Sequence, residues 1–417
     1  MASIRLRNIG SISDTGTIEL LPINLFIGKQ SSGKSTLLKI LCYCRWLDKQ
    51  AAIGTKVNGQ TIAYAYGHYY RFVKELMHFY RFNSSFFNEK SHIAYVGDVI
   101  DITFFGNERT NAQITTKPNA ERYNSKICFV PSERNLLSAM KNIQDGYRSS
   151  DMDMLFNFVF EWGEYKEDFT SEHKLRLTVA PDMEYYYDKE KGEQIKILGK
   201  NNDLPPFSPF YASSGIQSAF PLEVITSSLI GTVGKNAKLS QSDLTQIVAR
   251  ILRDGGSNKD LTEVLKQTRN ESTQLLTYQS IQLFVEEPEQ NLFPSSQISI
   301  TERLVKAIKE SNRRANNTKS MVVMTTHSPY VLSAINVLMA ASEAYDINPE
   351  ATEEIIEKQL IPKKGSIGAY SIDENGNIRD LVSSDIYMVD GTFLDSASDV
   401  VEERMAKLNE IICASEY

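Results

Sequence analysis

The run Ile23-Asn24-Leu25-Phe26-Ile27, followed by Gly28-Lys29-Gln30-Ser31-Ser32-Gly33-Lys34-Ser35-Thr36, decides the fold of this chain. The first stretch is short and nearly continuously apolar, which is typical of a strand buried on both faces. The second has the spacing GxxxxGKS of a phosphate-binding loop, and apolar residues follow it at helical spacing from Leu37 to Leu41. A strand, a glycine-rich loop and a helix in this order predict an α/β fold that binds a nucleotide.

The loop has the residue types that phosphate binding requires. Gly28 and Gly33 let it curl, so that successive backbone N–H groups point at phosphate oxygens. Lys34 places a cation on the β- and γ-phosphates, and the Ser35 hydroxyl is expected to coordinate Mg²⁺. The predicted nucleotide-binding set is Gly28, Lys29, Gln30, Ser31, Ser32, Gly33, Lys34, Ser35 and Thr36.

A second apolar run, Ile281–Val285, ends in consecutive carboxylates. A charged side chain directly after a fully apolar strand costs free energy unless it is paired or binds a ligand. A solvated loop without a function is therefore the disfavoured interpretation. We expect Glu286 to hold Mg²⁺, and Glu287 to orient or deprotonate the water that attacks the γ-phosphate.

A third apolar run ends in Thr325-Thr326-His327-Ser328-Pro329. A lone histidine is usually structural. His327, however, follows the third strand of a pattern whose other two strands already end in phosphate and metal chemistry, which favours a role in sensing the γ-phosphate.

These three motifs, in this order, resemble those of the ABC-type ATPases. The long gap between Lys34 and Glu286 excludes compact P-loop proteins and leaves room for an inserted helical lobe. Within the gap, Ser213–Gln217 resembles the ABC signature loop, which in that family reaches across a dimer to the partner's γ-phosphate. The resemblance therefore adds Ser214 and Gly215 to the nucleotide-binding set.

Within this class the chain resembles the overcoming-lysogenization-defect (OLD) family and related bacterial AAA-type ATPases over about residues 1–340. Besides the loop, the resemblance is carried by Phe129–Arg134, Glu286–Pro294 and Thr326–Pro329. Pro131–Arg134 takes the place of the family's Q-loop. Three positions depart from the family pattern: Gln30 (often Asn), Glu286 (usually Asp) and Phe293 (commonly His).

Many members of that family continue into a Toprim nuclease domain. The residues after 340 show no set of carboxylates on strand ends, because the candidates fall in turn-like or irregular sequence: Asp373, Asp380, Asp385 and Asp390. We therefore expect no nuclease in this chain.

The predicted fold is α/β, a P-loop NTPase of the ABC ATPase type with a mixed sheet, N-terminal β-hairpins and an inserted helical lobe. Residues 1–140 are expected to form the N-terminal half of the ATPase core, with an aromatic-rich insert at about 61–90. Residues 141–275 form the inserted lobe, with a β-hairpin, the signature-like loop and a helical segment at 240–270. Residues 276–345 complete the core, and 346–417 form a C-terminal extension.

Composition excludes several classes of protein. The chain is 41% hydrophobic and 10% aromatic, which excludes a long disordered chain, and its net charge of -7 disfavours a globally basic nucleic-acid binder while leaving a local patch open. The four cysteines form no zinc-binding set and are expected as free thiols. The sequence shows no signal peptide and no apolar stretch of membrane-spanning length, so we expect a cytoplasmic protein with no membrane partner.

The aromatic-rich insert leaves two interpretations open. Its aromatics lie among Arg71, Lys74 and Arg81, and such a mixture can stack on single-stranded nucleic acid. An amphipathic segment whose rings pack on the body of the protein is the favoured alternative, given the acidic chain.

The expected function is an ATP-binding and ATP-hydrolysing switch. Two subunits, as a homodimer or within a higher homo-oligomer, would sandwich ATP and Mg²⁺, and hydrolysis through Glu287 would open the sandwich. The OLD-like resemblance implies a separately encoded effector, a nuclease of bacterial anti-phage defence as in Septu, retron or PARIS systems. The alternative is a DNA-engaging ATPase of the repair or SMC class, against which the acidic charge and the lack of long heptad repeats stand. The ATPase of a membrane transporter fits least well.

Overall fold

The computed structural model of the protein describes residues 2–139, 153–199, 204–235, 277–382, 387–391 and 402–408. The helical segment expected at 240–270 and the acidic candidate Asp385 lie outside these residues.

The centre of the molecule is a mixed sheet, and the three apolar runs of the sequence form adjacent strands in it. The strands follow one another across the sheet in the order β10 (Ser125–Val130), β14 (Ser280–Glu286), β15 (Met321–Thr326), β4 (Ile23–Gly28), β16 (Ile367–Ile372) and β17 (Ile378–Asp380). All neighbours pair in parallel except β16 and β17. Every residue of β4, β14 and β15 is buried, as continuous apolar runs predict for a sheet covered on both faces.

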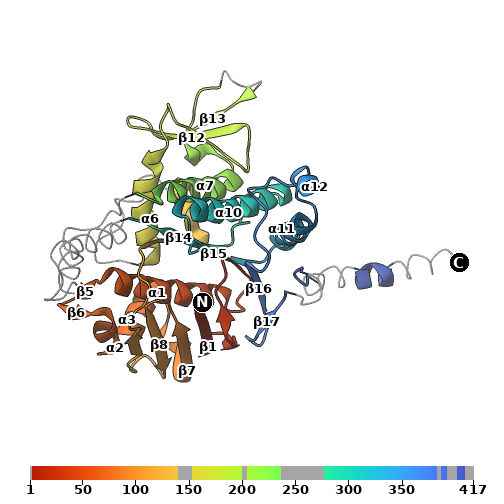
Figure 1. Ribbon diagram of the computed structural model, residues 1–417. Helices are drawn as coiled ribbons and strands as arrows, with labels where there is room; N and C mark the ends of the chain where they lie inside the picture. The colour runs from red at the N-terminus through yellow and green to blue at the C-terminus, as the bar shows by residue number, and fades with distance from the viewer. Residues whose placement is uncertain are drawn as a thin grey trace.

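Helices cover both faces of the central sheet, as Figure 1 shows. One face packs on α1 (Lys34–Ile53); the other packs on α6 (Met154–Tyr165), α7 (Ser214–Thr232), α10 (Pro294–Ala315) and α11 (Pro329–Ile347). Successive residues of β4 serve the two cores in turn, since Phe26 lies in the α1 core while Leu25 and Ile27 lie in the opposite one. The α/β class with a mixed sheet is thus confirmed.

A second, antiparallel sheet lies on the far side of α1. It consists of β1 (Ser3–Ile9), β2 (Ile12–Asp14), β3 (Ile18–Glu19), β7 (Phe87–Val96), β8 (Ile100–Phe105) and β9 (Gln113–Thr116). The pairing of β1 with β2 and β3 confirms the N-terminal hairpins. In addition, β1 pairs with β7, a long-range partner that its own alternating pattern does not specify.

The aromatic-rich insert packs mainly on the body of the protein. It forms β5 (Lys56–Val57), β6 (Gln60–Thr61), α2 (Ile62–Gly67), α3 (Arg71–Tyr80) and the 3₁₀ turn η1 (Ser84–Phe86). Tyr66, Phe72 and Tyr80 are buried in the core around α1, whereas Tyr64 and Tyr69 are exposed. The packing interpretation therefore accounts for most of the rings.

The predicted hairpin between the two halves of the core is also present. The strands β11 (Leu175–Arg176), β12 (Met183–Asp188) and β13 (Gly192–Ile197) form an antiparallel sheet at the top of Figure 1, beyond α7. The shorter elements are η2 (Ser132–Asn135), α4 (Leu136–Ala139), η4 (Lys166–Asp168), η6 (Pro209–Tyr211) and α12 (Pro349–Glu353).

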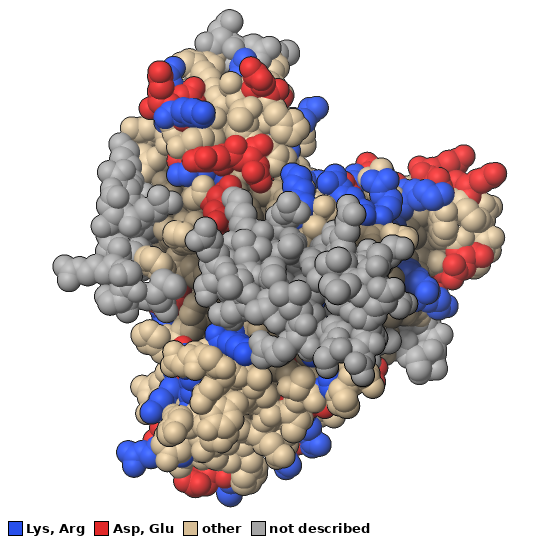
Figure 2. Space-filling model, turned by 60° about the vertical axis from the view of Figure 1, so that its left-hand side comes forward, with Lys and Arg blue, Asp and Glu red and all other residues tan. Residues whose placement is uncertain are grey.

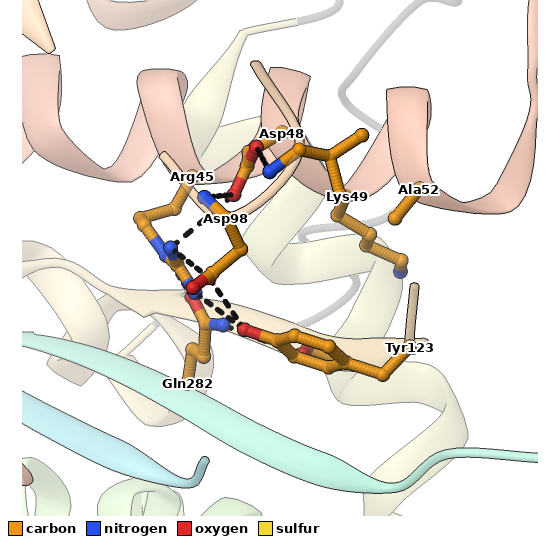
Figure 3. A pocket seen from close by; sticks show the side chains of 9 residues that line it. Arg45, Asp48, Lys49, Ala52, Asp98, Tyr123 and Gln282 are labelled. Carbon is orange, nitrogen blue, oxygen red and sulfur yellow. Dashed lines mark hydrogen bonds and ion pairs between the residues drawn. The ribbon is translucent and has the colours of Figure 1, made fainter. Parts of the chain in front are cut away.

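A buried polar network ties α1 to both sheets (Figure 3). Arg45 of α1 donates to Gln282 on β14 at 2.9 Å, and it pairs with Asp98 at 2.7 Å and with Asp48 at 3.3 Å. Asp48 in turn accepts the backbone N–H groups of residues 98–100, in the turn between β7 and β8. The network holds the second half of α1 between the two sheets.

Three further features bear on the expectations. Cys42, Cys44 and Cys128 are free and buried, as expected of structural thiols. No helix of the described residues combines the length and apolarity needed to cross a bilayer. The region 346–417, expected as an extension, contributes β16 to the central sheet, directly beside β4.

Candidate nucleotide-binding site

The loop between β4 and α1 has a backbone that only glycine fits at two points. Gly33 has φ +107°, and a Cβ built there would lie 2.7 Å from Cγ1 of Ile12. A Cβ on Gly28 would lie 2.6 Å from the carbonyl oxygen of Ile372, at the end of β16. The loop therefore packs closely between the N-terminal hairpin and β16, and at these two positions there is no room for a side chain.

The first turn of α1 is arranged to receive an anion. No side chain caps the helix at Gly33, and no acidic residue lies in its first turn. The first N–H groups of a helix lack partners within the helix and carry partial positive charge, which favours a phosphate. The buried Ser32 hydroxyl beside them has no hydrogen-bond partner within the described ranges of the chain.

Lys34 is held at the centre of the site. Its ammonium donates to the carbonyl oxygens of Gly28 at 2.9 Å and Lys29 at 2.7 Å, and lies 3.4 Å from Nδ1 of His327. Burial lowers the pKa of Lys34 to about 8, against the opposing attraction of Glu287 and Glu289. Burial disfavours the charged ammonium form of Lys34, whereas the negative charge of a bound phosphate would favour it and so raise the pKa again.

Glu286 ends β14 as a buried carboxylate with spare capacity to bind a cation. Its Oε2 accepts the N–H of Ser132 at 3.4 Å, while Oε1 is buried and has no hydrogen-bond partner among the described residues. Burial raises the pKa of Glu286, and the nearby Lys39 charge and Ser35 hydroxyl oppose that rise. An unsatisfied buried carboxylate oxygen beside a serine hydroxyl fits a hard divalent cation such as Mg²⁺.

Glu287 and His327 contact each other across the ends of β14 and β15. Oε1 of Glu287 lies 3.4 Å from Nε2 of His327, and the other ring nitrogen faces Lys34. The hydrogen bond with His327 is the main cause that lowers the pKa of Glu287, and burial opposes it. Glu287 therefore stays ionised near neutral pH, as a residue that accepts a proton from water requires.

Two residues that support the site were not assigned a role from the sequence alone. Glu289 accepts hydrogen bonds from the Thr326 hydroxyl at 2.7 Å and from the His327 N–H at 2.8 Å, and so fixes the histidine loop. Arg134, whose role the sequence left open, is completely buried beneath the carboxylates. The sequence shows Glu289 as one of the acidic residues at the end of β14 and just after it. Only the tertiary structure shows that its carboxylate binds the end of the neighbouring strand, β15.

One open cavity of about 730 Å³ unites the phosphate loop with the other two strand ends. Its lining includes Glu287 and His327 together with most of the loop, namely Gln30, Ser31, Gly33, Lys34, Ser35 and Thr36. Its far wall consists of Gly10 and Ser11 from the β1–β2 turn and Ser85 and Phe86 from η1. This wall was not anticipated, because no local pattern in the sequence links residue 10 to residue 86.

Ser214 and Gly215 do not line this cavity. They occupy the first turn of α7, which the exposed Ser213 caps by accepting the N–H of Ile216. A Cβ on Gly215 would lie 2.9 Å from the carbonyl oxygen of Asn291. Ser214 is exposed at this helix N-terminus.

The described residues contain no cluster of three or more His, Cys, Asp or Glu side chains able to hold a metal ion by themselves. Mg²⁺ at a nucleotide site does not need one, because it keeps several waters and binds one or two protein oxygens together with the phosphates.

Comparison with known proteins gives distant structural likenesses only. No protein-family model and no curated protein sequence matches the chain. The SMC head domain from Thermotoga maritima is 11% identical, with 80% of this chain and 90% of that chain covered and a TM-score of 0.32. A structure of the recombination mediator protein RecF-ATPrS in the RecFOR pathway is 11% identical, with coverages of 91% and 97% and a TM-score of 0.30. At these TM-scores neither likeness supports an argument about function, which rests below on the site.

Proposed function

We propose that this protein is a Mg²⁺-dependent ATPase of the ABC type that acts as a nucleotide-driven switch. One observation carries the proposal: Lys34, His327 and Glu287 form a continuous chain of contacts, at 3.4 Å each, on one wall of the cavity that the phosphate loop lines. Three segments distant in sequence thus converge where parallel strands end, the usual place for ligands in open α/β sheets.

Each residue of the site has a role in this proposal. The loop N–H groups and Lys34 bind the phosphates, while Ser35 and Glu286 hold Mg²⁺. The metal, when bound, would neutralise charge that develops on the phosphate oxygens. Glu287 accepts the proton of the attacking water, and His327 senses the γ-phosphate from its place between Lys34 and Glu287.

The switch requires a second subunit. Ser214 and Gly215 lie outside the cavity of their own chain, so we propose that they complete the site of a partner copy in a homodimer or a higher homo-oligomer. ATP would hold the two copies together, and hydrolysis through Glu287 would release them.

The biological setting rests on the OLD-like resemblance of the motifs alone. It suggests a cytoplasmic switch that controls a separately encoded nuclease in bacterial anti-phage defence. In the described C-terminal region Asp373 directly follows β16 and Asp380 ends β17, so these two carboxylates lie at strand ends and not in the irregular sequence expected of them. Asp373 accepts the N–H groups of Asn375 and Asn377 within the turn between the two strands.

Replacing Glu287 with Gln tests the catalytic part of the proposal. Glu287→Gln should bind ATP but hydrolyse it at least about 100-fold more slowly, since a general base contributes about 10²–10⁴-fold. It should also accumulate as an ATP-bound dimer in native mass spectrometry. Glu184→Gln on β12, outside the site, is the matched control and should behave as the unmodified protein. Normal hydrolysis by Glu287→Gln would refute the assignment.

The effector is best sought by native mass measurement of the protein expressed with its genomic neighbours, with and without ATP. The proposal expects a complex with a nuclease whose composition or activity changes on hydrolysis. A protein that assembles with no neighbour in either state would contradict the effector role.

The alternative function, a DNA-engaging ATPase, stays a prediction. The charge pattern of the described surface gives it little support. Figure 2 shows a face on which Lys and Arg form a row at the upper right that leads to a group of Asp and Glu. Several lysines on or near α10 have carboxylate partners: Lys306 with Glu357, Lys358 with Glu353, and Lys364 with Glu343. Such pairs reduce the charge available to a phosphate backbone.

A further inference from the structure

Arg134 is a buried ion that has no carboxylate partner among the residues that the structure describes. Its side chain has no exposed surface, and its hydrogen bonds to the described part of the chain all go to backbone carbonyl oxygens. The acceptors are Ser218 (2.8 Å), Pro131 (3.3 Å), Glu286 (2.8 Å), Glu287 (2.7 Å) and Pro288 (3.4 Å). Burying a charge is expensive, and peptide dipoles offset the cost only where their geometry is fixed.

Three of these acceptors are consecutive residues of the turn that carries the proposed general base. Glu287 has φ 44°, in the left-handed region that a non-glycine residue rarely adopts and that costs about 1–3 kcal/mol. Arg134 binds the carbonyls of Glu286 and Glu287, the peptide groups on either side of the Glu287 Cα. It thereby fixes the two peptide planes whose orientation directs the Glu287 side chain toward His327.

The remaining nitrogen of Arg134 reaches the helix that begins with the signature-like residues. Nε donates to the carbonyl oxygen of Ser218 on α7. Asn291, four residues after Glu287, adds a second link by donating from its side chain to the Ser218 hydroxyl at 3.0 Å. The first turns of α7 and the turn after β14 are therefore joined through buried polar contacts.

Pro221 loosens α7 directly after this connection. A proline inside a helix has no N–H, so the carbonyl oxygen of Gln217 loses its helical donor and accepts the Ser138 hydroxyl at 3.3 Å instead. Pro221 thus removes one of the hydrogen bonds that would join the first turns of α7 to the remainder of the helix.

We propose that Arg134 is a positioning residue for hydrolysis, which holds Glu287 in its left-handed conformation and couples it to the first turns of α7. The inference rests on the proposed ATPase function and extends it: what binds at Ser214 and Gly215 is transmitted through Arg134 to the general base. Arg134 touches neither the phosphates nor the water itself.

Steady-state kinetics of Arg134→Lys and Arg134→Met test the inference. Lysine keeps the charge but cannot bind several carbonyls in one plane, so both variants should lose kcat by about 100-fold while KM for ATP stays within about threefold. Arg45→Met is the matched control, since it removes another buried arginine, in the Figure 3 network, and should lower stability while kcat stays within about twofold. Equal losses of kcat in Arg134→Lys and Arg45→Met would show a general structural effect and overturn the inference.

A double variant separates positioning from simple destabilisation. If Arg134 acts through Glu287, then Arg134→Lys should reduce the residual rate of Glu287→Gln by less than about twofold, because the group that it positions is already absent. A full additional 100-fold loss would overturn the inference. Absence of ATPase activity in the unmodified protein would refute the proposed function and this inference together, whereas an active protein with normal kcat in Arg134→Lys would refute the inference alone.

Discussion

The Lys34 side chain should make nucleotide binding depend on pH in a range where an ordinary lysine would not. Burial lowers the pKa of Lys34 to about 8 in the nucleotide-free protein. The negative charge of bound phosphates favours the ammonium form and returns the pKa toward its usual value of 10.5. Binding above neutral pH therefore takes up a proton, and the affinity follows the fraction of Lys34 that is already protonated.

The magnitude follows from that fraction. With a pKa of about 8 in the free protein, the apparent affinity should fall about eightfold between pH 7.5 and pH 9.0 by proton linkage. A lysine with an unshifted pKa would give a change of only about 3% over the same interval. At pH 8.0 the uptake should be about half a proton per nucleotide bound.

Isothermal titration calorimetry with a non-hydrolysable ATP analogue and Mg²⁺ measures both quantities. Affinity is compared at the two pH values, and proton uptake at pH 8.0 is obtained from two buffers of different ionisation enthalpy. Lys34→Met serves as the control and should lose binding at every pH. A change in affinity below about twofold, or no proton uptake at pH 8.0, would refute the reasoning.

The lowered pKa of Lys34 also determines how the free energy of unfolding changes with pH. The nucleotide-free protein should become more stable as pH rises from about 8 toward 10.5, because in that range the unfolded chain keeps a proton on Lys34 that the folded state has lost. Urea unfolding across this range checks the direction of the change. Arg45→Met should lower the free energy of unfolding by about 3–5 kcal/mol, since Asp48 and Asp98 lose the cation between them; a loss below about 1 kcal/mol would contradict this. Gly33→Ala should weaken nucleotide binding at least about tenfold, because its φ of +107° and the nearby Ile12 side chain leave no room for a Cβ. Duplex DNA at physiological salt should change the ATPase rate less than about twofold, and a larger stimulation that falls steeply with salt would favour the DNA-engaging alternative.

Much of the central sheet was predictable because its strands are buried on both faces. A strand covered on both sides must be apolar along its whole length, so β4, β14 and β15 are visible as short runs in the sequence. The polar residues that follow such runs stand out for the same reason. Lys34, Glu286, Glu287 and His327 could therefore be identified before their contacts were known.

The signals for β16 and Arg134 were weaker. The alternating pattern around β16 predicts a hairpin, which β16 forms with β17. The pattern does not predict that β16 also pairs in parallel with β4 and packs on the phosphate loop at Gly28. Arg134 follows a buried strand and lies near a turn, where an arginine side chain is usually exposed to solvent. Neither pattern contains the long-range partner that determines the position.

The amino-acid sequence by itself determined which residues are candidates for the site, because the phosphate loop, the strand-end carboxylates and the histidine are local patterns with local physical causes. Only the tertiary structure decided how they are supported: the wall of Phe86 and Ser11, the Glu289 contacts to the histidine loop, and the Arg134 bridge between α7 and the turn of Glu287. Each of these joins segments that are far apart along the chain. Such contacts depend on the strand order and on the packing of the layers, which no single stretch of sequence encodes.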